Sequence, residues 1–484
     1  MPRPKAAPNM GSLLGTPQRF SPLVTLCLGL HRVVMGRAQR GRGDELKKRR
    51  RPGVNQQQRQ SGQPQHDHVH TSSPSKLTMY SSVFAAAAAA VVLSRAQVAL
   101  GRVPSQAQLI DQKSFNNLPS VPPPAVFNIS GAFTPPGTTV ESLSNKPFHV
   151  YDKEFLKVIG SNPTLTLIGQ TASDPIFHEA VVWSPKTEEV FFAQNAGAPA
   201  AGTGLNKSAI VQKISLAQAA AVSGQRNATG KVEITTVDAK PTIINANGGT
   251  NYRGKIVFAG EGMGENIPST LFVMDPVAPY NTTVLLNNFY GRQFSSLNDV
   301  AVNPRNRDLY FTDVLYGFWQ NFRPAPGLPN QVYRYDDSTG AVSVVADGFD
   351  APNGLVFSPD GKRAYVTDTG LSHGVLGLNL SRPATIYRFD VEADGTWGNR
   401  KTFAYASSGV PDGVHCDAKG NVYAGVGDGV HVWNPSGKLI GKIFIGTGVA
   451  NFAFAGKGRM VICAETKLFY ATLGAEGAVI PSEM

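Results

Sequence analysis

Four side chains with oxygen donors stand at equivalent places in this chain, each at the start of a short apolar run. Two are carboxylates and two are amides: Glu179, Asn298, Asn353 and Asp412. Ca²⁺ takes about six to eight such hard oxygen ligands in flexible geometry, whereas Zn²⁺ favours Cys and His. If the fold brings the four side chains together, they form a Ca²⁺ site with positions left open for water and a substrate.

Such a site has a definite chemistry. A cation with open positions is a Lewis acid and would polarise a carbonyl or phosphoryl oxygen. Asp412 then either activates a water as general base or attacks the electrophile itself, and the residue types leave both options open. Asp299, next to Asn298, is the expected neighbouring carboxylate that orients the ligands. His178 and His415 are candidate proton carriers, with packing between strands as the alternative for each.

Each of these residues also has an ordinary structural interpretation. Asn353 and Asp412 both precede a glycine, which is a common turn dipeptide. Asp313 and Asp368 end apolar runs, and we expect them to accept hydrogen bonds from backbone donors of the next hairpin rather than contact a substrate. The functional interpretation depends on register, because the ligand candidates recur at one place of a longer repeat.

Six stretches repeat a polar residue, an apolar strand, a turn and a second apolar strand. They are His178 to Gln194, Asn247 to Gly262, Leu297 to Asp313, Pro352 to Asp368, Pro411 to Gly425 and Val449 to Glu465. Further hairpins lie between them, so each unit offers about four strands, as in a propeller blade. Asn353 lies 55 positions after Asn298 and 59 before Asp412. We therefore predict an all-β, six-bladed β-propeller over residues 148–484, in which the polar residues converge at one end of the axis.

Three smaller expectations concern the body of the chain. One segment, Ile214 to Val222, favours a helix. Irregular stretches rich in Gly or Pro, around Asn247 to Tyr252 and Leu315 to Leu328, are expected to be substrate loops. Cys416 and Cys463 form either one disulfide or two buried thiols.

The formal net charge of +11 is confined to one end of the chain. Residues 1–78 hold 14 Lys and Arg against 3 Asp and Glu, which leaves 45 − 14 = 31 basic and 34 − 3 = 31 acidic residues elsewhere. Nucleic-acid-binding domains usually carry a basic face of their own, so no nucleic-acid role is expected for the propeller. The first 78 residues are a low-complexity basic arm that cannot bury a core.

The segment after the arm resembles a secretory signal peptide. Residues 79–101 begin with Met79 and contain the apolar run Val83 to Leu93, followed by small residues. The run is too short to span a bilayer, so no transmembrane anchor is expected. Leu23 to Leu30 is an alternative targeting segment. If Met79 is the true start, the protein is secreted, and residues 102–147 form a proline-rich linker. Secretion fits five N-x-S/T triplets, which begin at Asn128, Asn206, Asn227, Asn281 and Asn379.

The motifs HEAVVW, LNDVAVNP, PNGLVFSPDG and PDGVHCD resemble those of the senescence-marker-protein/gluconolactonase family, which includes regucalcin and fungal lactonases. The resemblance covers about residues 148–475. It implies a six-bladed propeller with catalytic Ca²⁺ bound by Glu179, Asn298, Asn353 and Asp412, and hydrolysis of a small-molecule lactone. Ser296 replaces the arginine that gluconolactonases carry before the second motif, which argues against a sugar-lactone preference. Arg292 is a possible substitute for that cation.

Three other functions compete with lactone hydrolysis. A phosphotriester could react at the same site, because the metal would polarise its P=O oxygen in the same way. A non-catalytic propeller could use calcium as a structural plug under an interaction platform. A metal-free condensing propeller of the strictosidine-synthase kind is disfavoured, because it needs no Asn-Asn-Asp set.

Overall fold

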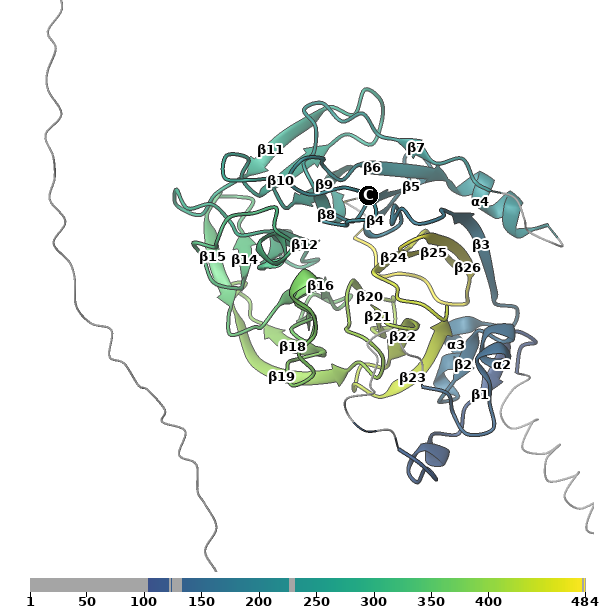
Figure 1. The fold of residues 1–484 in the computed structure, drawn as a ribbon. Helices are drawn as coiled ribbons and strands as arrows, with labels where there is room; N and C mark the ends of the chain where they lie inside the picture. The colour runs from purple at the N-terminus through teal and green to yellow at the C-terminus, as the bar shows by residue number, and fades with distance from the viewer. Residues whose placement is uncertain (1–102, 122, 124–132, 226–230, 481–482, 484) are drawn as a thin grey trace, which may run out of the picture. The chain divides into compact units, whose positions relative to one another are not determined.

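The computed structural model describes residues 103–121, 123, 133–225, 231–480 and 483. Their strands form six sheets around a central axis, which confirms the predicted six-bladed β-propeller (Figure 1). The basic arm, both candidate targeting segments and the triplets at Asn128 and Asn227 lie outside the described residues. Among the described residues, no helix has the length and apolarity needed to cross a membrane.

Blades 1 to 4 are four-stranded antiparallel meanders. The strands of each blade are given in order from the axis outward. Blade 1 consists of β4 (Glu179–Ser184), β5 (Glu189–Ala193), β6 (Val211–Ser215) and β7 (Thr235–Thr236). Blade 2 consists of β8 (Ala246–Tyr252), β9 (Lys255–Gly260), β10 (Thr270–Met274) and β11 (Thr282–Leu286). Blade 3 consists of β12 (Leu297–Val302), β13 (Leu309–Asp313), β14 (Gln331–Tyr335) and β15 (Val342–Ala346). Blade 4 consists of β16 (Pro352–Phe357), β17 (Arg363–Asp368), β18 (Thr385–Val391) and β19 (Trp397–Tyr405).

Blades 5 and 6 each include strands from the start of the body. Blade 5 has β20 (Val414–Cys416), β21 (Val422–Val426), β22 (Gly429–Trp433) and β23 (Leu439–Phe444), extended by β2 (Phe148–Val150) and β1 (Ala107–Leu109). Blade 6 has β24 (Asn451–Phe454), β25 (Arg459–Ala464), β26 (Lys467–Thr472) and, outermost, β3 (Thr164–Gln170). The antiparallel pairing of β3 with β26 closes the ring by joining the two ends of the body.

The six sequence repeats correspond to the two inner strands of the six blades. These strands are covered on both faces by neighbouring blades, so β12 and β13 are buried along their whole length and read as apolar runs. The helix-prone segment forms α4 (Leu216–Ser223), whose first turn is capped by the Ser215 hydroxyl. Cys416 and Cys463 are free buried thiols that belong to separate core clusters.

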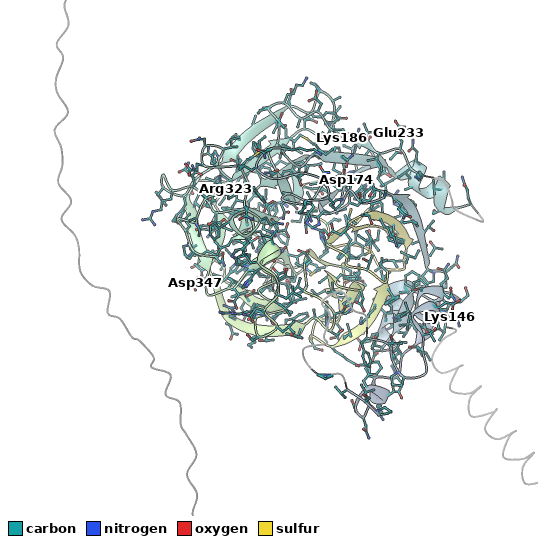
Figure 2. The ribbon with its side chains drawn as sticks, viewed as in Figure 1. Lys146, Asp174, Lys186, Glu233, Arg323 and Asp347 are labelled. Carbon is teal, nitrogen blue, oxygen red and sulfur yellow. The ribbon has the colours of Figure 1, made fainter. Side chains whose placement is uncertain are left out.

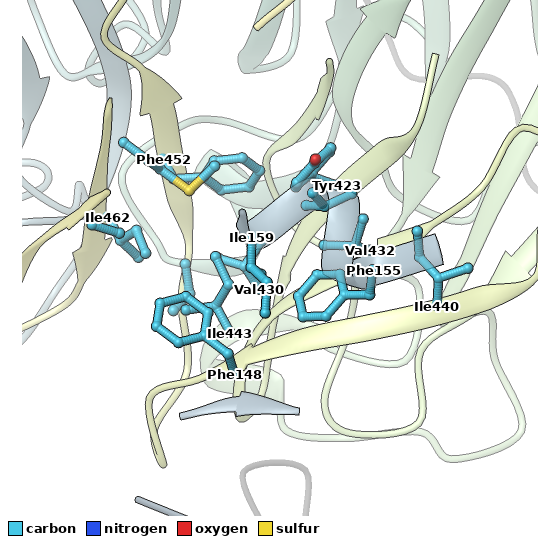
Figure 3. Close-up of a cluster of buried hydrophobic side chains, with 14 of the residues drawn as sticks. Phe148, Phe155, Ile159, Tyr423, Val430, Val432, Ile440, Ile443, Phe452 and Ile462 are labelled. Carbon is cyan, nitrogen blue, oxygen red and sulfur yellow. The ribbon is translucent and has the colours of Figure 1, made fainter. Parts of the chain in front are cut away.

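Part of the predicted linker is ordered structure that extends blade 5. It contains β1, the 3₁₀ helix η1 (Gln112–Phe115) and α2 (Val140–Asn145), and β1 pairs in parallel with β2. The following helix α3 (Glu154–Ile159) packs Phe155 and Ile159 onto β22 and β23 (Figure 3). A Cβ at Gly441 would overlap the Phe155 ring, so this strand needs glycine where the helix lies against it. The propeller body therefore begins before residue 148.

A buried polar cluster fastens β2 to the blade. His149 lies opposite Lys442, which in turn lies opposite His431 in the next strand. Asp428 accepts from His431 Nε2 at 2.7 Å and from Lys442 Nζ at 3.1 Å. Burial lowers the pKa of His149 to about 4, and the Lys442 charge adds to this effect despite the hydrogen bond to the Leu143 carbonyl. His149 is therefore neutral in the folded protein at neutral pH.

This cluster predicts an acid-sensitive attachment of β2. The folded pKa of His149 lies below the ordinary value of 6.5, so the unfolded chain binds the extra proton and stability falls as the pH drops from about 6.5 towards 4. His149→Phe keeps a ring stacked on Phe444 but removes the titration. Urea unfolding should show a shallower pH slope for the variant, by up to about 1.4 kcal/mol per pH unit. Equal slopes for the two proteins would contradict this account.

Candidate active site

The innermost strands of blades 1 to 4 share a β-bulge at the residue that opens each repeat. Between Glu179 and Val182 the register against β5 slips by one residue, and β8, β12 and β16 slip at the same place. A bulge adds one residue to one strand and redirects the side chains beside it. In blade 1 the bulged residue is Ala180, at a φ of 49°. Asn298 and Asn353 therefore lie within the bulges of their strands, whereas Glu179 directly precedes the bulge of β4.

The structure brings the four predicted ligands together. Glu179, Asn298 and Asn353 are buried at the start of β4, β12 and β16, and Asp412 precedes β20 at the same end of the axis. A Cβ at Gly354, next to Asn353, would overlap the Asp412 carbonyl oxygen. Burial and the Asp412 charge together raise the pKa of the Glu179 carboxyl. Four residues separated by 233 positions (412 − 179) thus meet in one ring, which we call the axial ring.

Two oxygens of the axial ring have no protein partner. Within the described residues, Glu179 Oε1 and Asn298 Oδ1 are buried and accept no hydrogen bond. A buried polar atom without a partner costs about 1–3 kcal/mol, so such atoms call for a ligand or an ion. The described residues hold no group of three or more His, Cys, Asp and Glu side chains arranged for a metal, so a cation here would need amide oxygens as well as carboxylates. The donor set of the ring fits Ca²⁺.

The carboxylates of the ring lie in a strongly desolvated setting. Burial raises the pKa of Asp412 to about 6, opposed by the charge of His178. Burial also raises the pKa of Glu179, and the nearby Asp412 carboxylate adds to this effect. The charged forms of these carboxylates are therefore unfavourable without a nearby positive charge. A bound divalent ion would supply that charge.

Asp299 is bound to backbone rather than to the ring side chains. Its Oδ1 accepts from Val300 N and its Oδ2 from Leu355 N, both at 2.8 Å, and burial raises its pKa to about 7. The second bond joins blade 3 to blade 4. Asp299 therefore positions the strands that carry the ligands. Its carboxylate bonds backbone groups, and not the ligand side chains that the sequence predicts it to orient.

Threonines of the second strands link neighbouring blades in the same way. Thr367 Oγ1 accepts from Gly354 N at 2.7 Å and donates to the Asp412 carbonyl at 2.9 Å. Thr312 makes the equivalent pair of bonds with Asp299 N and the Asn353 carbonyl. Each hydroxyl thus accepts from a backbone N–H in the bulge of its own blade and donates to the backbone carbonyl of the ligand residue in the next blade.

The carboxylates that end the second strands accept backbone hydrogen bonds, as predicted, but most of the donors lie before the inner strand of the same blade and not in the next hairpin. Asp313 accepts from Ser295 N and Ser296 N, and Asp368 accepts from Asp350 N and Ala351 N. These donors lie just ahead of the ligand in the same blade. Both carboxylates therefore shape the approach to a ligand residue.

Glycines after the ligand residues are required by close packing rather than by turns. A Cβ at Gly354 would overlap the Asp412 carbonyl oxygen, and one at Gly248 would overlap the Asn298 carbonyl oxygen. The glycines of β8 explain one wrong expectation. Residues 247–252 are part of an inner strand and not a loop, because Gly248 and Gly249 let adjacent blades approach.

His178 forms a pair that the sequence did not indicate. Its Nδ1 lies 2.8 Å from Glu465 Oε1, across the junction of blades 6 and 1. Burial would lower the pKa of His178, but Glu465 outweighs it and raises the pKa to about 10, with help from Glu179. Glu261 is a further buried carboxylate beside this group, and it accepts from the Ser296 hydroxyl at 2.7 Å.

Two further amides, which were not predicted as ligands, lie beside the axial ring. Asn247 Nδ2 donates to the Asn298 carbonyl at 3.2 Å, and Asn451 Nδ2 donates to Glu179 Oε2 at 2.6 Å. His415 Nε2 lies 3.1 Å from Asn451 Oδ1. Their places at the start of the second and sixth repeats were the available signal. All six blades therefore contribute one oxygen-bearing side chain.

Long loops cover the ligand end over blades 1 to 4 only. Gly264 N donates to the Phe322 carbonyl, and Tyr316 Oη lies 2.6 Å from Thr369 Oγ1, so the loops of blades 2, 3 and 4 are tied together. Phe322 also packs on the loop of blade 1. Blades 5 and 6 have short turns at this end, at residues 427–428 and 465–466. The loop of blade 3 includes α5 (Tyr316–Trp319), and that of blade 4 includes η3 (Gly374–Leu376).

The predicted cation Arg292 lies on an exposed turn. The buried guanidinium of this region belongs to Arg323 (Figure 2), which donates to the carbonyls of Ser295 and Gly264 and to Gln293 Oε1. Arg323 therefore anchors the loop of blade 3.

Residues near the end of the chain lie at the opposite mouth of the channel. A cavity of about 160 Å³ lies among the inner strands and is lined by Val479 and Ile480, and also by His415 and Asn451. Glu483 fixes this segment by accepting from Arg253 N at 2.7 Å and pairing with Arg307 at 2.9 Å. The cavity therefore reaches from this mouth to residues beside the ring.

The close contact between blades 4 and 5 predicts that one added methyl group at Gly354 lowers the stability of the fold. Gly354→Ala places a Cβ against the Asp412 carbonyl and should destabilise the fold by about 1–3 kcal/mol, because overpacking forces the blades apart. Gly398→Ala is the matched control, since its Cβ would meet only Glu392 Oε1, at 3.9 Å. Urea unfolding measures both. A Gly354→Ala protein as stable as the control would disprove the close approach.

Comparisons with known proteins agree with this fold. Residues 268–465 match the family model described as SMP-30/Gluconolactonase/LRE-like region. The lactonohydrolase oryL of Aspergillus oryzae is 28% identical over 348 residues, which cover 67% of this chain and 73% of that protein. The gluconolactonase of Zymomonas mobilis is 27% identical over 219 residues, covering 43% and 56%. A solved gluconolactonase structure from Xanthomonas campestris has a TM-score of 0.53 at 21% identity, covering 68% of this chain and 94% of that one, and shows the same fold.

Proposed function

Because the chain belongs to the SMP-30/gluconolactonase/LRE-like family, we propose that it hydrolyses a lactone at the axial ring with the help of Ca²⁺. Glu179, Asn298, Asn353 and Asp412 would hold the ion. The observation that carries this proposal is the pair of buried oxygens, Glu179 Oε1 and Asn298 Oδ1, that lack a partner among the described residues. When bound, the ion would supply Lewis-acid polarisation of the lactone carbonyl.

Asp412 is the residue to which we assign the bond-making step. Its carboxylate is close enough to Glu179 to add to the rise that burial causes in the pKa of that carboxyl, and it lies at the ligand end, where we expect a substrate to arrive. As general base it takes a proton from water while the water oxygen bonds to the carbonyl carbon and the ring C–O bond breaks. As nucleophile its carboxylate oxygen bonds to the carbonyl carbon while the ring C–O bond breaks, and water then hydrolyses the resulting mixed anhydride. The proton ends on the released hydroxyl in both cases.

The surroundings of Asp412 suggest how a substrate is oriented. His178, held by Glu465, is the group we assign to hydrogen-bond the leaving oxygen. Entry is proposed over blades 5 and 6, where the turns are short, while the tied loops of blades 1 to 4 exclude water from the other side.

Activity assays test this function directly. We expect turnover of aldonolactones or aromatic lactones that is lost with a chelator and restored by Ca²⁺. Asp412→Asn should lower kcat by about 100-fold or more, because an amide can neither accept the proton nor attack. Asp360→Asn is the matched control: this carboxylate caps the turn between β16 and β17, and its loss should leave kcat unchanged.

Other outcomes separate the competing functions. Calcium binding without turnover of any lactone would favour the non-catalytic platform, and turnover of a phosphotriester alone would replace the substrate class. A single turnover in ¹⁸O-water that labels the Asp412 carboxylate would establish the nucleophilic route, because water then opens the anhydride on the Asp412 side, whereas general-base catalysis labels only the product acid.

We also propose that the protein is secreted after cleavage near residue 101. Val83 to Leu93 supports this, and of the acceptor asparagines in the described residues, Asn206 and Asn281 are exposed. Expression in a eukaryotic host should give a protein in the medium that starts close to residue 102 and shifts in mass with an N-glycosidase. An intact Met1 in the cell extract, with no protein in the medium, would overturn the proposal.

A further inference from the structure

Asn451 opens the sixth repeat and lies where the last blade meets the first. It is buried at the start of β24, and its Nδ2 donates to Glu179 Oε2 at 2.6 Å. The two residues are 272 positions apart. This bond therefore crosses the same junction that β3 closes at the rim, but it does so at the axis and on a proposed ligand.

The orientation of the Asn451 amide is fixed from its other side. Oδ1 accepts from Phe452 N at 2.7 Å and lies 3.1 Å from His415 Nε2. Rotating the amide by half a turn would place its NH₂ group against Phe452 N, a donor against a donor. A Cβ at Gly413 would overlap this amide, so the neighbouring blade leaves room for it. Nδ2 consequently has to face Glu179.

This arrangement divides the two oxygens of Glu179 between different tasks. Oε2 accepts from Asn451, whereas Oε1 is buried and has no partner among the described residues. We infer that Asn451 is a positioning residue, which holds Glu179 so that a single oxygen, Oε1, is presented to the cation. The inference rests on the calcium site proposed above and extends it to a residue outside the ligand set.

Asn247 shows that this role is not common to every amide of the ring. Asn247 occupies the equivalent place in the second repeat, and its Nδ2 donates to the backbone carbonyl of Asn298. That bond fixes main chain, whereas the bond of Asn451 fixes a ligand side chain. Partners that orient metal ligands typically affect metal affinity by about 10- to 100-fold.

Calorimetric titration of the chelator-treated full chain with CaCl₂ tests the inference without any assay of activity. Asn451→Ala should weaken the Kd for Ca²⁺ about 10-fold or more, because Glu179 Oε2 then keeps only the longer bond from Ala180 N, at 3.3 Å. His415→Phe keeps the ring packed edge-on against Phe452 but loses the contact with Asn451 Oδ1. It should weaken the Kd by about two- to fivefold, since Phe452 N still holds the amide.

Asn303→Ala is the matched control. Asn303 is an equally buried amide at the far end of β12, where it bonds the Gly361 carbonyl, so the variant should lose stability but keep the Kd within about twofold. Near-UV circular dichroism shows which variants are folded, and His415→Phe carries the test if Asn451→Ala is not. A folded variant series with the wild-type Kd would overturn the positioning role while leaving the calcium site intact. No calcium uptake by the wild type would instead overturn the calcium site itself.

Discussion

The closing of six sheets on one axis is the constraint on which the rest of this molecule depends. Each blade places the start of its inner strand at the axis, where ligand residues such as Glu179 and Asn298 are buried and there is little room between neighbouring blades. The blades answer with hydrogen bonds to one another, such as Thr367 to the Asp412 carbonyl and Asn451 to Glu179. Local bulges, glycines at contact points and threonines in the second strands are all consequences of that crowding.

The same crowding explains why the site is chemically poised. Glu179 and Asp412 are carboxylates that the fold buries close together, so the charged forms are costly unless a cation offsets them. Glu179 Oε2 is paired with Asn451 Nδ2, whereas Glu179 Oε1 and Asn298 Oδ1 are buried without a partner among the described residues. Buried oxygens of this kind call for a ligand or an ion.

Access to the site depends on parts of the molecule that do not repeat. The loops of blades 1 to 4 are long and tied to each other through Arg323, Phe322 and Tyr316, whereas the turns of blades 5 and 6 are short. On the other mouth, Glu483 holds the end of the chain in place. In the function proposed above, the symmetric ring would supply the ligands of the ion, and the asymmetric loops would decide from where a substrate reaches it.

Six repeats, the strand pairs and the places of Glu179, Asn298, Asn353 and Asp412 followed from the sequence, because strand periodicity, turn residues and register are local signals. The partners of those residues did not. Asn451 and Glu465 act on Glu179 and His178 across 272 and 287 positions, and nothing in the local pattern marks such a contact. The expectation that residues 247–252 form a loop was wrong for a related reason. Gly248 and Gly249 are typical of a loop in the sequence, but in the closed ring they allow neighbouring blades to approach. Sequence by itself thus determined which side chains face the axis, and only the closed ring decided which of their atoms are paired and which are left free.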